Sequence, residues 1–596
     1  MSCHQREPGF KLLKLVAACI ACSMSAMLQR VRQSILALLP ESGRLSDSRT
    51  QAPQLESHRR PAPCASALRA LSNIDILDAI FSHFEYSSFH AIEDTPDAVA
   101  KHISTNHGND VTRTTTLAHS ARVCKTFSEP ALRILWRQLP DVFPLLRLLP
   151  SLYRVQENVP TGRRQWPIVL DIYHLPKDIT EDECDRLLQY ATYVRRLFAL
   201  GPTPFKRAEI TEEGWMSIIH ALGDQPFLPN LGTLHWLVDR PAEEIPRMTA
   251  LLSSSVKVMK VYCLMDLEQE VRPPEIQEAW QPYLQQLIET LPERAPKLVD
   301  LAFHTEDLDT RLVLEPLSLT HSDSLRTLSL SNAPKCTRIS FDLPGLLPLT
   351  RFTALQSLTL TLSLADIVVD DRTPEIRLDN LTQLRLPYHP GHSCALDAIA
   401  STSLRELEIS GLNCFIPFSF QSICASWVRS FPQLESISCW LASEDVEQVA
   451  SRLPISTLFE PLLTLPRMRK VWIAFTSWLP IVVTDQDFTT FAQAWPLIEQ
   501  LHLTAAAFHL SCYQTGLPSL VALATHCPRL SDLLMVQLVI RQDDVDNLPS
   551  ETPNPLHALR AVKVNYGMQP AVYRLVRDRI FPNLVQKPAE DWLYHD

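Results

Sequence analysis

Residues 324–330 of the chain read SLRTLSL, and three of these seven side chains are leucine. Leu328 and Leu330 alternate with polar residues, a spacing typical of a short strand with one buried face. Leu325 comes before the strand and is expected to turn inward. The stretch therefore predicts a strand whose leucine side must be covered by another part of the protein.

The same apolar-x-x-apolar-x-apolar run recurs along the C-terminal two-thirds of the chain. Its twelve copies lie at residues 229–236, 258–263, 296–303, 324–330, 354–360, 380–386, 403–409, 432–439, 467–473, 496–503, 528–535 and 558–564. Their first apolar positions run from 231 to 559, which gives an average period of about 30 residues. A single copy cannot bury its own apolar face, so neighbouring copies are expected to stack and to stabilise one another.

Helix-like stretches lie between the copies, at residues 282–289, 418–428, 488–495 and 517–525. Such alternation of strands and helices predicts the α/β class. The period and pattern resemble those of leucine-rich repeat proteins, and this resemblance implies a solenoid in the form of a horseshoe. The asparagine that often occupies the inner turn of these repeats is missing from most copies. The spacing is also irregular, which indicates inserted loops.

Three short amphipathic helices are predicted upstream of the repeats. The first begins near Ser72, which forms a capping-box-like pair with Asp75. Its apolar residues recur every three to four positions and so form one stripe along the helix. The second is expected at residues 117–127, after a long polar loop at residues 86–116. Pro130 is expected in the first turn of the third helix, where its missing N–H costs nothing.

This helical module is similar in sequence to the F-box family, specifically to the divergent F-box proteins with leucine-rich repeats that are abundant in fungi. The matching stretches are residues 71–84 (LSNIDILDAIFSHF), 121–127 (ARVCKTF) and 131–139 (ALRILWRQL). Two features depart from the family. Ser72 and Asn73 stand where the family has Leu-Pro, and the connection between the first two helices is unusually long. Both departures bear on how tightly the module would bind the adaptor, and not on the fold of the module.

The resemblance implies a substrate-recognition subunit of a Skp–cullin–F-box ubiquitin ligase, which acts in ubiquitin-dependent protein degradation. The module would dock a Skp-type adaptor and, through it, a cullin, while the repeats would bind a target protein. Such a receptor is not an enzyme and needs no cofactor or metal. The residues expected to bind the adaptor are Leu71, Ile74, Leu77, Phe81, Val123 and Trp136. The alternative role of these residues is to hold the three helices together.

A second interpretation is a non-catalytic leucine-rich repeat scaffold without ligase association. Polar positions in or beside the strands are candidate target contacts under either interpretation; they include Glu406, Glu408, Glu499 and Gln500. The sequence predicts a tail and linker at residues 1–66, disordered or weakly helical, and an F-box-like module at 67–142. It further predicts a transition with degenerate first repeats at 143–226, the solenoid at 227–585 and a tail at 586–596.

Composition and motifs narrow the function further. The net charge of −11 gives no general attraction to nucleic acid. Glycine is scarce, at 13 residues, and no phosphate-binding or hydrolase motif occurs. Cysteines are scattered and predict reduced core thiols, and the pair Cys19-x-x-Cys22 lacks further ligands at zinc spacing.

The apolar run at residues 12–28 resembles a signal peptide but is interrupted by Lys14 and by serines. It is shorter than a membrane span, so no membrane association is expected. Two interpretations remain open for this run. In the first it is part of an intracellular tail, and the protein is cytoplasmic or nuclear. In the second it directs a recognition protein to secretion or to an organelle, and cleavage near residue 26 would favour secretion.

Overall fold

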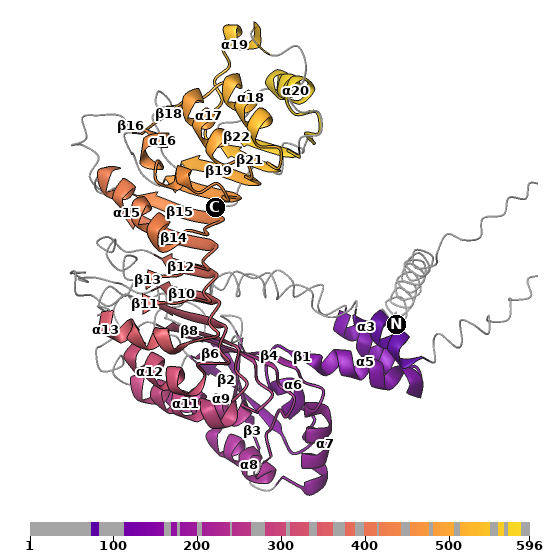
Figure 1. Cartoon of the computed structure of the whole chain (residues 1–596). Helices are drawn as coiled ribbons and strands as arrows, with labels where there is room; N and C mark the ends of the chain where they lie inside the picture. The colour runs from indigo at the N-terminus through magenta and orange to yellow at the C-terminus, as the bar shows by residue number, and fades with distance from the viewer. Residues whose placement is uncertain are drawn as a thin grey trace, which may run out of the picture. The chain divides into compact units, whose positions relative to one another are not determined.

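The computed structural model (Figure 1) shows an α/β protein with a large parallel sheet and many helices. It describes residues 73–82, 113–159, 168–175, 179–199, 206–223, 225–238, 241–263, 280–305, 310–332, 343–361, 376–387, 399–413, 417–442, 453–475, 481–505, 513–546, 548, 558–564 and 570–585. The predicted tails at 1–66 and 586–596 lie outside these ranges.

The main sheet has fourteen strands within the described ranges, all parallel and in the order of the chain. The strands are β1 (Gln138–Leu139), β4 (Arg196–Ala199), β6 (Thr233–Val238), β7 (Val258–Cys263), β8 (Asp300–Thr305), β9 (Thr327–Asn332), β10 (Ser357–Thr361), β12 (Gln383–Pro387), β14 (Glu406–Asn413), β15 (Ser436–Ala442), β17 (Lys470–Phe475), β19 (Gln500–Ala505), β21 (Asp532–Met535) and β22 (Ala561–Val564). Each of the twelve sequence copies supplies one strand, from β6 to β22. The strands β1 and β4 extend the sheet upstream of residue 227.

One row of apolar side chains crosses the whole sheet in register. It consists of Leu139, Leu197, Leu234, Met259, Leu301, Leu328, Leu358, Leu384, Leu407, Ile437, Val471, Leu501, Leu533 and Val562. All fourteen are buried. Burying one such side chain stabilises a fold by about 1.5–3 kcal/mol. Because members of the row lie side by side on paired strands, their burial stabilises the packing of neighbouring strands.

Helices connect many of these strands, and α20 follows the last of them. They include α6 (Phe143–Leu146), α7 (Glu181–Ala191), α8 (Glu212–Leu222), α9 (Pro241–Leu251), α11 (Trp280–Arg294), α12 (Thr310–Thr320), α13 (Leu343–Leu346), η2 (Leu347–Arg351), α15 (Pro417–Ser430), α16 (Ile455–Leu458), η3 (Leu462–Thr464), α17 (Asp485–Ala494), α18 (Leu517–His526), α19 (Gln542–Asp546) and α20 (Pro570–Arg579). The four predicted helix-like stretches overlap α11, α15, α17 and α18. Right-handed crossovers between parallel strands in chain order place the connecting segments on one face of the sheet.

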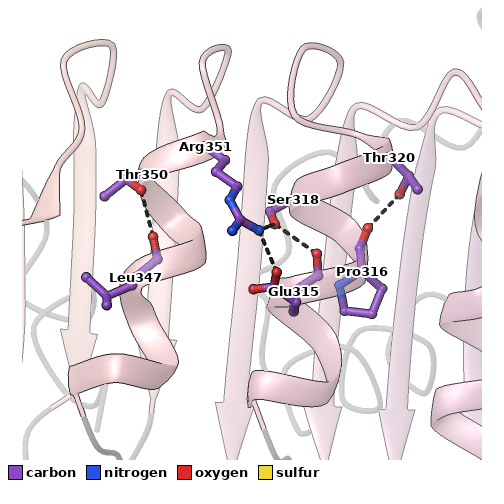
Figure 2. A network of polar contacts seen from close by, with 7 residues as sticks. All are labelled: Glu315, Pro316, Ser318, Thr320, Leu347, Thr350 and Arg351. Atoms are coloured by element: carbon purple, nitrogen blue, oxygen red, sulfur yellow. Dashed lines mark hydrogen bonds and ion pairs between the residues drawn. The ribbon is translucent and has the colours of Figure 1, made fainter.

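Figure 2 shows how neighbouring connections contact one another on that face, where α12 and η2 lie over the strands. The guanidinium of Arg351, in η2, donates to the Glu315 carboxylate at 2.6 Å and to Ser318 Oγ at 3.3 Å, both in α12. About half of each charged side chain is exposed, so the pair adds little stability beyond fixing the two turns side by side.

Three small sheets accompany the main one in the described residues. In the first, β2 (Tyr153–Val159) pairs antiparallel with β3 (Ile168–His174), which pairs parallel with β5 (Lys206–Ile210). The others are short parallel sets, β11 (Ile376–Arg377) with β13 (Ile399–Ala400), and β16 (Leu453–Pro454), β18 (Ile481–Thr484) and β20 (Tyr513–Gln514). The strands β2 and β3 therefore belong to an insertion between β1 and β4.

Candidate functional site

The helical module begins with α3 (Ile74–Ser82). Asn73 caps this helix, because its side-chain Oδ1 accepts the Asp75 N–H at 2.9 Å and its carbonyl accepts the Leu77 N–H at 3.1 Å. Two residues named from the sequence lie outside the described residues. They are Ser72, expected at the start of this helix, and Leu71, expected to bind the adaptor.

The second and third helices differ from the sequence prediction. The described helix runs over residues 113–121 and so ends before residue 127, while α5 (Lys125–Arg137) contains Pro130 in its interior. The prediction of Pro130 in the first turn was therefore wrong. The segment ahead of Pro130 is helical because Phe127 packs edge-on against Phe81, with ring centroids 6.0 Å apart. The predicted loop at 86–116 also ends earlier, since the chain is helical from 113.

Leu77 and Phe81 form the centre of this module. Their exposed fractions are 1% and 3%, and they pack with Leu117, Ala131 and Ile134. Arg133 of α5 adds a surface ion pair with Asp78 of α3 at 2.9 Å. In the free chain the two apolar side chains therefore hold the helices together, which is the alternative role that the sequence left open for them.

Ile74 and Val123 have the opposite environment. Ile74 is 51% exposed on α3, and Val123 is 69% exposed in the turn that precedes α5. Ile76 is also exposed, at 39%. Three large aliphatic side chains of the module are therefore exposed to water. Of the predicted docking set, Ile74 and Val123 are the large aliphatic members that are exposed in the described residues.

Trp136 lies where the module joins the main sheet. Its ring centroid is 5.0 Å from that of Tyr190 in α7, and it packs against the large core. Nearby, Tyr193 donates its hydroxyl hydrogen bond to the Glu129 carboxylate at 2.7 Å. Burial and this carboxylate raise the pKa of Tyr193 to about 12, so the hydroxyl remains a donor at all physiological pH.

The joint contains no linker, because α5 ends at Arg137 and β1 begins at Gln138. The Arg195 N–H donates to the Arg137 carbonyl at 2.8 Å, and β1 pairs with β4 directly afterwards. The last helix of the module thus continues into the first strand of the sheet. The boundary expected at 142/143 lies five residues beyond the junction at 137/138.

The face of the sheet opposite the leucine row carries aromatic side chains in two groups. Between β4 and β8, rings contact one another in series from Phe198 to His235, Tyr262 and His304, with centroid distances of 4.7, 6.1 and 4.8 Å; the last pair is stacked and the other two are tilted. Between β15 and β19, Trp472 contacts Trp440 at 5.8 Å and His502 at 6.0 Å. Trp472 is 44% exposed, and exposed tryptophans are frequent anchors of protein–protein contacts.

The polar candidates named from the sequence form pairs across neighbouring strands. Glu406 accepts from Gln383 at 3.0 Å, Glu408 pairs with Arg385 at 2.9 Å, and Glu499 contacts Arg469 at 3.5 Å. Gln500 lies in register with Lys470 and Asp532.

The aromatic groups were not named from the sequence. Their signal was available in the alternation, because Trp472 and His502 occupy the same place in their copies as Glu408, between two buried apolar residues.

The described residues also bear on metal binding, thiol chemistry and membrane crossing. No group of three or more His, Cys, Asp or Glu side chains there is arranged to hold a metal ion. Cys19 and Cys22 lie outside the described ranges. Burial raises the pKa of the Cys527 thiol to about 12, as expected of a core thiol. None of the described helices has the length and apolar character required to cross a membrane.

Comparison of the chain with models of known protein families found no match, and comparison with curated proteins found none either.

Proposed function

We propose that this chain is the substrate-recognition subunit of a Skp–cullin–F-box ubiquitin ligase, with an F-box-like module and a leucine-rich repeat solenoid. The repeat interpretation is supported by the twelve sequence copies, each of which supplies one strand of the main sheet. The adaptor role rests on the sequence resemblance and on the exposed Ile74 and Val123 of the module.

The observation that supports this function best is the direct continuation of α5 into β1. A ligase receptor performs no bond chemistry; it holds a target where a ubiquitin-charged enzyme can reach it. A flexible linker between adaptor-binding and target-binding parts would weaken that orientation. In this chain the junction is instead held by two side-chain contacts, the ring contact of Trp136 with Tyr190 and the hydrogen bond from Tyr193 to Glu129.

Copurification with a Skp-type adaptor tests the proposal. We expect the wild-type chain to recover the adaptor, and the double variant Ile74→Asp with Val123→Asp to lose it, because two charges would replace exposed apolar contacts. Both side chains are exposed, so the variant is expected to fold. Leu319→Asp is the matched control, since Leu319 is 68% exposed on α12, outside the module.

Substitutions at Leu77 and Phe81 cannot serve in this test, because both side chains are buried and a charge there would disrupt the module itself. If the wild-type chain recovers no adaptor, the receptor proposal is wrong. The non-catalytic repeat scaffold without ligase association would then be the better description.

A further inference from the structure

Two adjoining hollows lie near the N-terminal ends of the central strands. The first has a volume of 540 Å³ and is lined by Arg326 and Arg405 and otherwise, apart from Ala354, by side chains with amide or hydroxyl groups. The second has a volume of 480 Å³ and is lined by Arg377, Arg429 and Asp379, among others. Thr402 lines both, so we treat them as one surface and call it the arginine hollow.

The arginine hollow is basic although the chain as a whole is acidic. Its lining contains four guanidinium groups and one carboxylate, in a protein with a net charge of −11. Within the described residues, Arg326 and Arg429 have no carboxylate at ion-pair distance. Arg405 pairs with Glu435 at 3.3 Å, but Glu435 also pairs with Arg469 at 3.4 Å, so one carboxylate serves two cations.

The spacing of the arginines is fixed by the backbone. Arg326 and Arg405 are the residues directly before β9 and β14, and Gln356 and Thr382 hold the same place before β10 and β12. Hydrogen bonds of 2.8–2.9 Å link these four residues in a row, each from one N–H to the preceding carbonyl. At about 4.8 Å per strand, the two arginines are about 14 Å apart along the row, which about four residues of an extended peptide would span.

We propose that the arginine hollow binds an acidic peptide segment of a protein partner through its carboxylate or phosphate oxyanions. Guanidinium groups bind both kinds of oxyanion with two parallel hydrogen bonds. A nucleic acid fits less well, because the residues lining the hollow include no aromatic ring on which a base could stack. The assignment of this acidic segment to the target protein rests on the proposed function.

Fluorescence anisotropy with the full-length chain tests the proposal. The probes are a labelled peptide rich in Glu, the same peptide with phosphoserine in place of some glutamates, and a neutral peptide with Gln in place of Glu. We expect the acidic probes to bind and the neutral one not to bind. Affinity should fall as NaCl rises from about 0.05 M to about 0.5 M.

The variant Arg326→Ala with Arg405→Ala is expected to bind the acidic probes at least about tenfold more weakly, because each lost charge removes charge-assisted hydrogen bonds. Both residues are exposed, so the fold is expected to remain intact by circular dichroism. Arg560→Ala is the matched control, because Arg560 is the exposed residue directly before β22, outside the hollow. Its affinity should equal that of the wild type.

The outcomes separate the alternatives. Binding of both acidic probes identifies carboxylates as sufficient, and binding of the phosphorylated probe alone identifies phosphate. Failure of both acidic probes to bind, or equal binding by the double variant, would overturn the proposal. Tighter binding of a single-stranded oligonucleotide, lost in the same variant, would overturn it in favour of nucleic acid. Adaptor copurification is measured separately, so either proposal can fail without the other.

Discussion

At the scale of single residues, the fold depends on side chains that alternate between a covered and an open face. Leu358 is fully buried in the row that crosses the main sheet, and Thr359 beside it points to the other face. The alternation was visible in the sequence, so the strands were predictable from it. The sequence did not show which side chain of the next copy each leucine would meet, because the loops between copies differ in length.

Leu358→Ala tests the importance of this row. We expect the free energy of unfolding to fall by about 2–5 kcal/mol, since the change leaves a cavity between Leu328 and Leu384. The measurement is urea unfolding followed by circular dichroism, with Thr359→Ala as control. An equal loss in both variants would contradict the assignment of the two faces.

His321 is predicted to make stability depend on pH. Its ring is buried, its Nε2 donates to the Ala295 carbonyl at 3.2 Å, and burial lowers its pKa below 6.5. Below pH 6.5, His321 becomes protonated in the unfolded chain but stays neutral in the folded chain. The free energy of unfolding therefore falls as the pH drops towards the folded-state pKa.

The melting temperature, measured between pH 7 and pH 5, checks this prediction. His321→Gln should show a smaller loss on acidification than the wild type, whereas His526→Gln, at an exposed position, should show the wild-type loss. If His321→Gln and the wild type lose stability in parallel, His321 is not responsible.

At the scale of elements, strands were easier to predict than helix ends. Each copy of the repeat gave a strand, but the two residues of β1 are too few to show any periodicity. Pro130 suggested a helix start at the wrong place, because the tertiary contact of Phe127 with Phe81 outweighed the local rule for proline. The alternation in the sequence indicated which side chains lie on the uncovered face of the main sheet. The exposure of Ile74 and Val123 could not be predicted in this way, because it depends on how the helices of the module pack.

The junction between α5 and the sheet is predicted to depend on Trp136. Trp136→Ala should increase hydrogen exchange in α5, β1 and α7, because it removes the ring contact with Tyr190. Tyr193→Phe should have a smaller effect, since it removes only the hydrogen bond to Glu129. Unchanged exchange in Trp136→Ala would show that the backbone pairing of β1 with β4 is sufficient.

At the scale of the whole described chain from α3 to α20, stability accrues between neighbours. Each strand of the main sheet pairs with the next strand of that sheet along the sequence. The polar contacts on the helical side, such as Arg351 with Glu315, also join neighbouring units. The face opposite the leucine row carries the exposed Trp472, and the arginine hollow lies beside the starts of the central strands.

The central claim is that this chain delivers a target to a ubiquitin ligase, and affinity purification with and without proteasome inhibition tests it most directly. We expect at least one protein to accumulate on the wild-type chain under inhibition, and to be recovered without inhibition on the Ile74→Asp, Val123→Asp variant, which should bind the target but not the adaptor. Recovery of the same proteins in the same amounts, whatever the inhibitor or variant, would contradict the claim.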